Sequence, residues 1–293
     1  MAEKPFTPTE MKNMILLQQG ELDSQLIYAK LAEIIKDSNN KKVLKRISGE
    51  ERKHYQVWKV QTKQDVKENK TKVTFYFWLA RLLGLTFVIK LMERGEEETQ
   101  EAYSQLLKRV PEAQAMLKDE EQHEDELVAM IDEESLRYAG SVVLGLNDAL
   151  VELTGALAGF SFAFQQPRLI ALAGLITGIS ASFSMAASEY LSSKADGEGK
   201  DAIKSALYTG AAYIFTVAML VFPFLVSGNY LLALGWTLLN AVLIIAAFNY
   251  YISVAKDLDF KRRFTEMTLI SLGVAAFSFA IGVAIRTWIG IDI

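Results

Sequence analysis

Apolar and polar residues follow two patterns along the chain, and the change between them lies near Tyr138. Before this residue apolar side chains recur at helical spacing among charged ones, whereas after it they form long, nearly continuous runs. Spacings of three and four residues predict amphipathic helices, and apolar runs of about 20 residues predict helices that cross a bilayer. The sequence therefore predicts an all-α protein with a charged helical domain at residues 1–137 and a transmembrane domain at residues 138–293.

Four helices are predicted in the first part, at residues 8–37, 41–68, 93–109 and 111–137. Apolar residues recur at spacings of three and four, as in Met14 with Leu17 and in Leu22, Leu26 and Ala29. The last helix begins at Pro111, which suits a first helical position because its fixed backbone angle is already helical. Helices of this length joined by short connections predict a four-helix bundle.

A further apolar run, "VTFYFWLARLLGLTFVIKLM" at residues 73–92, has the length of a membrane span but contains Arg81 and Lys90. Three interpretations are open: the buried stripe of a helix in the charged domain, an interfacial helix with aromatic anchors, or a true span. A span would place Glu21 and Glu96, which belong to a repeated motif described below, on opposite sides of the membrane. That consequence disfavours the third interpretation.

Five transmembrane helices are predicted in the second part, at residues 140–164, 168–191, 204–226, 230–254 and 266–289. Turn-forming and charged segments separate them. Basic residues gather after the second and fourth spans, and they are Lys194, Lys200, Lys204, Lys256, Lys261, Arg262 and Arg263. The positive-inside rule then predicts a multi-pass protein of the cell membrane whose N-terminal domain is cytoplasmic and whose C-terminus is outside.

Composition narrows the possible chemistry. The 293 residues include no cysteine, which excludes disulfides, thiolate metal sites and iron–sulfur clusters. The net charge is −4, and no basic patch with interleaved aromatic residues occurs, so nucleic acid is not an expected partner. Any metal must be bound by oxygen and imidazole.

A motif with a glutamate and a tyrosine seven residues later occurs twice in the charged part. The pairs are Glu21 with Tyr28 and Glu96 with Tyr103. Seven residues are almost two helical turns, so the two side chains of each pair share a face. The tyrosines are expected either to donate hydrogen bonds to nearby carboxylates or to fill the core.

The two histidines of the chain, His54 and His123, are each preceded three residues earlier by a glutamate, Glu51 and Glu120. Positions three apart share a helical face, so each segment offers a carboxylate and an imidazole to one ion. With the repeated glutamates, the order of ligands is that of known di-iron and di-manganese carboxylate sites in helical bundles. The predicted metal ligands are Glu21, Glu51, His54, Glu93, Glu96, Glu120 and His123, and Glu93 is either an additional ligand or a neighbour of Glu96.

Oxygen-rich ligation with one imidazole per metal suits iron or manganese. We therefore expect a dinuclear Fe2+/Fe3+ site, with Mn2+ as the other candidate. Residues 8–137 resemble the rubrerythrin and erythrin branch of the ferritin-like proteins in the Glu-x6-Tyr and Glu-x-x-His motifs. The resemblance implies a ferritin-like fold, although the chain lacks the cysteines of the rubredoxin-type iron that true rubrerythrins contain.

Ionisable residues also occur inside the predicted spans. Asp148 and Glu152 lie four residues apart in the first span, and Met185 and Glu189 have the same spacing in the second. Charges at membrane depth are costly and usually mark an ion or proton path. We expect these four residues to form a transport path, with Glu189 alternatively reaching the membrane interface.

These spans resemble the vacuolar iron transporter family in Asn147-Asp148-Ala149, in the segment from Ser184-Met185 to Glu189-Tyr190, and in their number. The resemblance implies a homodimeric transporter. The whole arrangement looks like the prokaryotic fusion of a ferritin-like domain with an iron-transporter domain. We expect export of Fe2+, or Mn2+, in exchange for protons, with the bundle capturing or sensing the metal. The alternative is a membrane-anchored di-iron ferroxidase or peroxidase.

Overall fold

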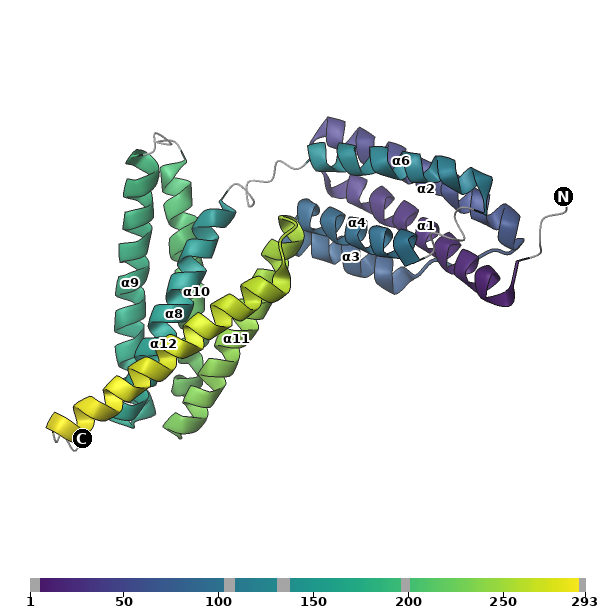
Figure 1. The fold of residues 1–293 in the computed structure, drawn as a ribbon. Coiled ribbons are helices and arrows are strands. Elements are labelled where there is room, and N and C mark those ends of the chain that lie inside the picture. The colour runs from purple at the N-terminus through teal and green to yellow at the C-terminus, as the bar shows by residue number, and fades with distance from the viewer. Residues whose placement is uncertain (1–5, 103–108, 131–137, 196–200, 290–293) are drawn as a thin grey trace. The chain divides into compact units, whose positions relative to one another are not determined.

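The computed structural model describes residues 6–102, 109–130, 138–195 and 201–289, and the regular structure in these ranges is helical. Figure 1 shows the helices in chain order. The chain divides into two compact units, Met1–Glu133 and Glu134–Ile293. They are called the N-terminal and C-terminal units below, and the boundary expected at residue 137 lies outside the described residues.

The N-terminal unit contains α1 (Pro8–Ile34), α2 (Ser38–Thr62), α3 (Lys70–Leu83), α4 (Leu85–Ala102) and α6 (Pro111–Ala129). Helix α1 starts with a capping box, in which Thr7 and Glu10 satisfy each other's backbone N–H groups;. Helix α2 ends earlier than expected, because Lys63 adopts a left-handed conformation with φ of 55° and its N–H bonds back to Lys59;.

The predicted helical faces of α1, α2 and α6 pack together. One core cluster joins them through Met14, Leu17, Trp58, Val110, Ala113 and Met116. The helical faces that carry the Glu-x-x-His motifs also point inward, since Glu51, His54 and His123 are buried. The core thus places the carboxylate–imidazole pairs of α2 and α6 in the interior of this unit.

The apolar run at 73–92 is divided between two helices. Gly84 separates α3 from α4 with φ of 92°, a conformation that favours glycine;. The helix predicted to start at residue 93 is therefore α4, which begins eight residues earlier, at Leu85. Within the described residues, this run is not among the helices long and apolar enough to cross a membrane, so the interpretation as a span is wrong.

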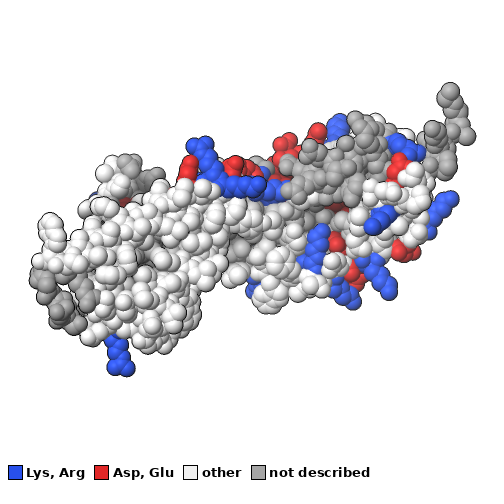
Figure 2. All heavy atoms as spheres, turned by 60° about the horizontal axis from the view of Figure 1, so that its bottom comes forward, with Lys and Arg blue, Asp and Glu red and all other residues white. Residues whose placement is uncertain are grey.

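The C-terminal unit contains α8 (Ala139–Phe164), α9 (Pro167–Ala195), α10 (Ala202–Val226), α11 (Tyr230–Ala255) and α12 (Phe260–Ile289). Among the described residues five helices are long and apolar enough to span a bilayer, and all belong to this unit. This confirms the predicted number and order of spans. Figure 2 shows the corresponding segregation of charge, with nearly uncharged surface on the C-terminal unit and mixed charge on the N-terminal unit.

Helix α8 packs closely against α10 and α12 because glycines lie at the crossings. A Cβ atom at Gly145 would lie 2.3 Å from the carbonyl oxygen of Thr209, and one at Gly282 would lie 2.7 Å from that of Gly159. Small residues allow such close backbone approach between membrane helices. The crossings fix α8, which carries Asp148 and Glu152, between two neighbours.

Candidate metal centre and membrane carboxylates

The two histidines face each other inside the N-terminal unit. His54 on α2 and His123 on α6 are each only 3% exposed. Their rings are stacked, with centroids 5.9 Å apart and an interplanar angle of 29°. The sequence alone predicted that they belong to one site, and the structure brings them together.

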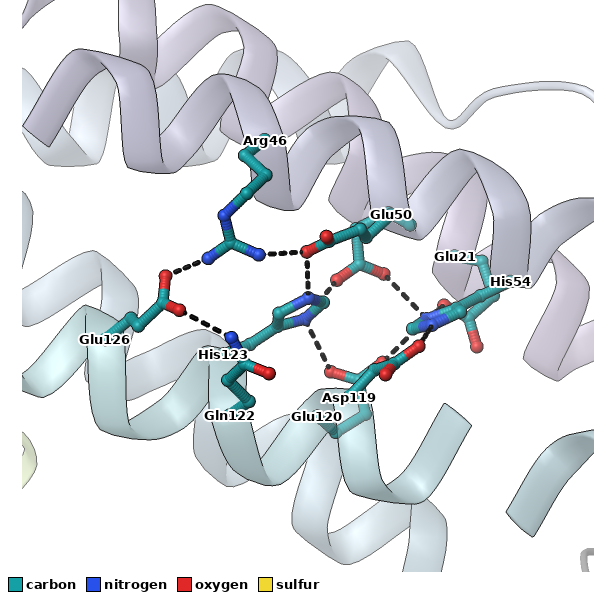
Figure 3. A network of polar contacts seen from close by, with 10 residues as sticks. Glu21, Arg46, Glu50, His54, Asp119, Glu120, Gln122, His123 and Glu126 are labelled. Carbon is teal, nitrogen blue, oxygen red and sulfur yellow. Dashed lines mark hydrogen bonds and ion pairs between the residues drawn. The ribbon is translucent and has the colours of Figure 1, made fainter. Parts of the chain in front are cut away.

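Two carboxylates face both imidazoles, and one of them, that of Glu120, is labelled in Figure 3. Glu51 directs Oε2 toward His54 Nδ1 at 3.9 Å and Oε1 toward His123 Nδ1 at 3.3 Å. Glu120 directs Oε1 toward His54 Nδ1 at 3.0 Å and Oε2 toward His123 Nδ1 at 3.4 Å. Each carboxylate is therefore shared, with one oxygen for each imidazole.

A third carboxylate, that of Glu21 on α1, joins the side of His54. Its Oε2 lies 3.6 Å from His54 Nδ1, and its Oε1 accepts a hydrogen bond from Trp58 Nε1 at 3.2 Å. Ligand atoms of Glu21, Glu51, His54 and Glu120 all lie within 4.8 Å of one another. This is a group of donors from three helices that could hold a metal ion.

The donor set fits a metal ion. Both Nδ1 atoms are fully buried, and neither makes a hydrogen bond of good geometry with a described residue although carboxylate oxygens face it. Buried polar atoms normally have a partner, and a cation between the imidazole nitrogens and the carboxylate oxygens would supply one. The surrounding oxygens are hard donors of the kind that iron and manganese accept.

The electrostatics of the metal-free cluster favour positive charge. Burial by itself lowers the pKa of His54, but the adjacent carboxylates of Glu120 and Glu21 outweigh it and raise the pKa to about 10. Burial likewise raises the pKa of Glu120, and the imidazoles of His123 and His54 more than reverse that effect and lower the pKa below its usual range;. A cation in the cluster, whether proton or metal, is therefore stabilised.

The outer nitrogens of the histidines have carboxylate partners that sequence reasoning missed. His54 Nε2 lies 3.3 Å from Asp119 Oδ2, and His123 Nε2 lies 2.9 Å from Glu50 Oε2. Such carboxylates fix the orientation of a metal-binding imidazole and raise its basicity. A signal was present in the sequence, because an acidic residue directly precedes the glutamate of each Glu-x-x-His motif.

These outer partners continue into a wider network. Arg46 forms ion pairs with Glu50 on its own helix and with Glu126 on α6, and Gln122 donates to Glu126 at 2.8 Å (Figure 3). The network ties α2 to α6 on the side of the cluster that His123 occupies. Its effect is to hold the two Glu-x-x-His segments in register.

The remaining predicted residues of this unit are placed as follows. Glu93 on α4 is buried and forms an ion pair with Lys90 at 3.0 Å, and Tyr28 is buried in the core. The side chain of Glu96, and Tyr103 as a whole, lie outside the described residues. The ligand roles of Glu93 and Glu96 stay predictions.

In the C-terminal unit the carboxylates have hydroxyl partners. Tyr213 on α10 is fully buried, donates a hydrogen bond to Glu152 Oε2 at 3.1 Å, and also lies within hydrogen-bonding reach of Asp148. Ser141 on α8 donates to Glu189 Oε1 at 2.7 Å and so links the first two spans. No pattern in the sequence distinguishes this tyrosine or this serine from others in the spans.

Met185 is half-buried against the core of the C-terminal unit. Its helix, α9, also carries Glu189, and the serine bond from α8 holds the two helices together at that level. The structure thus places the four predicted path residues on two adjacent helices, and it adds Tyr213 and Ser141 as their partners.

In a comparison with protein families, the model of the VIT (vacuolar iron transporter) family matches residues 139–202. These residues comprise α8, α9 and the start of α10, and they include all four predicted path residues. Searches of curated proteins and of solved structures found no match. The match and the five apolar helices support a membrane domain of the VIT type in a multi-pass membrane protein.

Proposed function

We propose that the protein is a transporter that exports Fe2+, with Mn2+ as a second substrate, in exchange for protons. The observation that carries the proposal is the family match over the two helices that hold Asp148, Glu152, Met185 and Glu189. The match favours a metal-ion transporter and gives no support to a membrane-anchored ferroxidase. The N-terminal unit would be a ferritin-like bundle that captures or senses the metal before transport.

The geometry of the cluster suits two ions. Glu51 and Glu120 each face both imidazoles, so each could bridge one ion beside His54 and another beside His123. Glu21 lies on the His54 side. The repeated motif assigns Glu96 to the other ion by analogy with Glu21, because both begin a Glu-x6-Tyr segment;.

The cluster borders a cavity of about 440 Å³ whose lining includes Glu21 and Glu120. The lining also contains Asp23, whose carboxylate is only 2% exposed and accepts a hydrogen bond from the backbone N–H of Asn69 at 2.8 Å. Lys72 also lines the cavity, but the three carboxylates outnumber it and attract cations;. The cavity would therefore load the cluster from the surface of the unit.

The membrane carboxylates would pass the ion onward and exchange it for protons. Asp148 and Glu152 share the hydroxyl of Tyr213, which is a neutral partner and adds no positive charge beside them. At membrane depth their negative charge has to be neutralised by a cation or by protonation. When a metal ion leaves Asp148 and Glu152, protons would bind the same carboxylates, and this would couple metal export to proton uptake.

A homodimer is supported by the surface of α8 and α9. Glu152 is exposed in the middle of the first span, and Ser180, Ser184 and Ser188 form an exposed stripe at four-residue spacing on α9. A carboxylate that faces lipid at this depth costs several kcal/mol. A second copy packed on this face would remove Glu152 from lipid and enclose the path.

Because the chain has no native cysteine, the dimer can be tested with single cysteines in membranes. Ser184→Cys should form an intermolecular disulfide under mild oxidation. Leu269→Cys, at a position 68% exposed on α12, is the matched control and should not. Equal cross-linking at both positions, or none at Ser184, would contradict this interface.

The transport proposal is tested by Fe2+ uptake into proteoliposomes under an imposed pH gradient, counting molecules whose N-terminal unit faces outward. Asp148→Asn should reduce uptake to the level of empty vesicles, and Glu120→Ala should weaken it. Glu266→Gln, which changes an exposed carboxylate on α12, should behave as wild type. If the wild-type protein moves no iron, or if uptake is indifferent to the pH gradient, the proposal fails.

A further inference from the structure

Helix α3 of the N-terminal unit presents an apolar face to solvent. Phe75 is 57% exposed, Trp78 61% and Leu82 81%. Their spacing of three and four residues places them on one side of the helix, while Val73 and Ala80, seven residues apart, are buried on the other side. Among the described residues, the helix therefore packs on its unit by one face and exposes the opposite one.

The charge on this helix itself has one sign, although Lys70 at its first position forms an ion pair at 3.6 Å with Glu68, which lies just before the helix. Residues 70–92 include Lys70, Lys72, Arg81 and Lys90 and no acidic residue, whereas the first 137 residues as a whole hold 25 acidic and 22 basic ones. The Arg81 guanidinium lies 5.9 Å from the ring centroids of both Phe77 and Trp78, and the Lys70 side chain is 84% exposed. Aromatic rings bordered by cations are typical of helices that lie in a membrane interface.

We propose that α3 docks on the lipid headgroup region of the bilayer that the C-terminal unit spans. Phe75, Trp78 and Leu82 insert among the lipids, and Arg81 and Lys70 contact anionic phosphates. This is an interaction surface additional to the transport function, and it requires only that the chain is a membrane protein.

The covalent structure makes lipid the favoured occupant. Nine residues connect the end of α6 to the start of α8, and a segment of that length spans at most about 30 Å when fully extended. A bilayer surface is thus always available at high effective concentration, so even a small apolar face is sufficient for docking.

A second copy of the chain fits this face less well. Three side chains provide much less than the roughly 800 Å² per partner of a stable protein interface. Two α3 helices packed face to face would also bring the Arg81 side chains of both copies together without acidic partners on the helix;. Anionic lipid has the complementary charge.

Docking would position the whole N-terminal unit, because α3 is fixed to α1 at its first turn. The backbone N–H of Asn69, the N-cap of α3, donates to Asp23 Oδ1 at 2.8 Å, and Lys72 Nζ lies 4.0 Å from Asp23 Oδ2. Asp23 lies two residues after Glu21 of the metal cluster. The helix that meets the lipid is therefore braced against the helix that supplies a predicted ligand.

The first test uses Leu82→Cys in the full-length protein, labelled with an environment-sensitive fluorophore and reconstituted in vesicles of phosphatidylcholine and phosphatidylglycerol. The control is Val60→Cys, at a position 71% exposed on α2. Lipids brominated near the headgroup should quench the Leu82 label about twofold more than the Val60 label. Equal quenching overturns the proposal. Protection of Leu82 from aqueous iodide without quenching by lipid also overturns it, because a second copy then covers the face.

The second test adds Trp78→Glu to the Leu82→Cys protein, with Val60→Glu as the matched exposed substitution and circular dichroism as the check on folding. Trp78→Glu should remove the lipid quenching at Leu82, while Val60→Glu should leave it unchanged. Arg81→Glu keeps the apolar face and should weaken the quenching in anionic vesicles more than in neutral ones. Docking is contradicted if the quenching persists in Trp78→Glu. It is also contradicted if the quenching changes neither with Arg81→Glu nor with the charge of the lipid.

Discussion

The two units of this protein give their carboxylates different hydrogen-bond and ion-pair partners. In the N-terminal unit Glu51 and Glu120 face two imidazoles, and ion pairs surround the cluster. In the C-terminal unit Glu152 and Glu189 have tyrosine and serine hydroxyls as their hydrogen-bond partners among the described residues. The first arrangement offers a cation many fixed donors, and the second offers few.

The difference follows from what each environment tolerates. A bundle interior next to water can hold charged groups when they are paired and hydrogen-bonded, so it can assemble a cluster that retains an ion. At membrane depth an uncompensated carboxylate is costly, and a proton or a metal ion can relieve that cost equally well. We therefore expect retention in one unit and exchange in the other.

The largest expected effect is a loss of metal binding by the N-terminal cluster that does not depend on the membrane carboxylates. Replacing both shared carboxylates, Glu51→Ala with Glu120→Ala, should abolish Mn2+ binding to the metal-free protein at micromolar concentrations, because each imidazole loses the two oxygens that these glutamates direct at it and only His54 keeps another, from Glu21. Calorimetric titration with Mn2+ measures this binding. Asp148→Asn should leave this binding unchanged, and if it removed the same ions the two sites would not be separable.

A smaller effect is expected from pH. The pKa of His54, raised to about 10 in the metal-free cluster, means that a proton occupies the imidazole at neutral pH and must leave when metal binds. Affinity for Mn2+ should therefore rise with pH, by up to about 100-fold between pH 6 and 8 at one proton per ion. Proton release measured in weakly buffered solution checks the stoichiometry, and a flat pH profile would contradict it.

The same elevated pKa has a consequence for stability. A group whose pKa is higher in the folded state stabilises that state below its unfolded pKa of about 6.5 and loses this contribution as pH rises through the folded value. The metal-free N-terminal unit should thus lose part of its stability toward pH 10. Thermal unfolding of the full-length protein, followed by the buried Trp58, measures this.

Removing the carboxylate at the outer nitrogen of His54 should lower the metal affinity about tenfold. Asp119→Asn keeps the size of the side chain but removes the charge that faces His54 Nε2 at 3.3 Å, and losses of about 10–100-fold in metal affinity are usual for such partners. Glu124→Gln, an exposed position on the same helix, is the control. Equal affinities of the two variants would show that Asp119 does not support the cluster.

The smallest effect on either site is expected from helix packing in the C-terminal unit. Gly145→Ala places a methyl group 2.3 Å from a backbone carbonyl, so the α8–α10 crossing must open at a cost of about 1–3 kcal/mol. Metal binding by the N-terminal unit should not change. Gly235→Ala on α11, where no atom lies within 4 Å, should be tolerated, and similar unfolding of both variants in detergent would contradict the close crossing.

Much of this architecture could be predicted from the sequence. Continuous apolar runs gave the five spans, because the length of a bilayer-crossing helix is fixed by the bilayer. The Glu-x-x-His motifs identified four residues that the structure brings together, since i and i+3 must share a helical face. The boundary at Gly84 was missed because one glycine within an apolar run does not by itself show that the chain turns.

The partners of the ligands were harder to predict, for a physical reason. Glu50, Asp119 and Arg46 belong to helices rich in charged residues, where most such side chains are solvated and their neighbours depend on how helices pack. The same holds for Tyr213, whose role as a donor to Glu152 depends on the α8–α10 crossing. Periodicity identifies a face but not what lies opposite.

The shared orientation of Glu51 and Glu120 toward both imidazoles has a consequence for how the cluster would fill. An ion at one position fixes both carboxylates, and each then already presents its second oxygen to the other position. The second ion would bind to a prearranged site, so half-filled molecules would be scarce. Occupancy would then change steeply over a narrow range of metal concentration. The N-terminal unit would respond when the metal concentration passes a threshold and not in proportion to it.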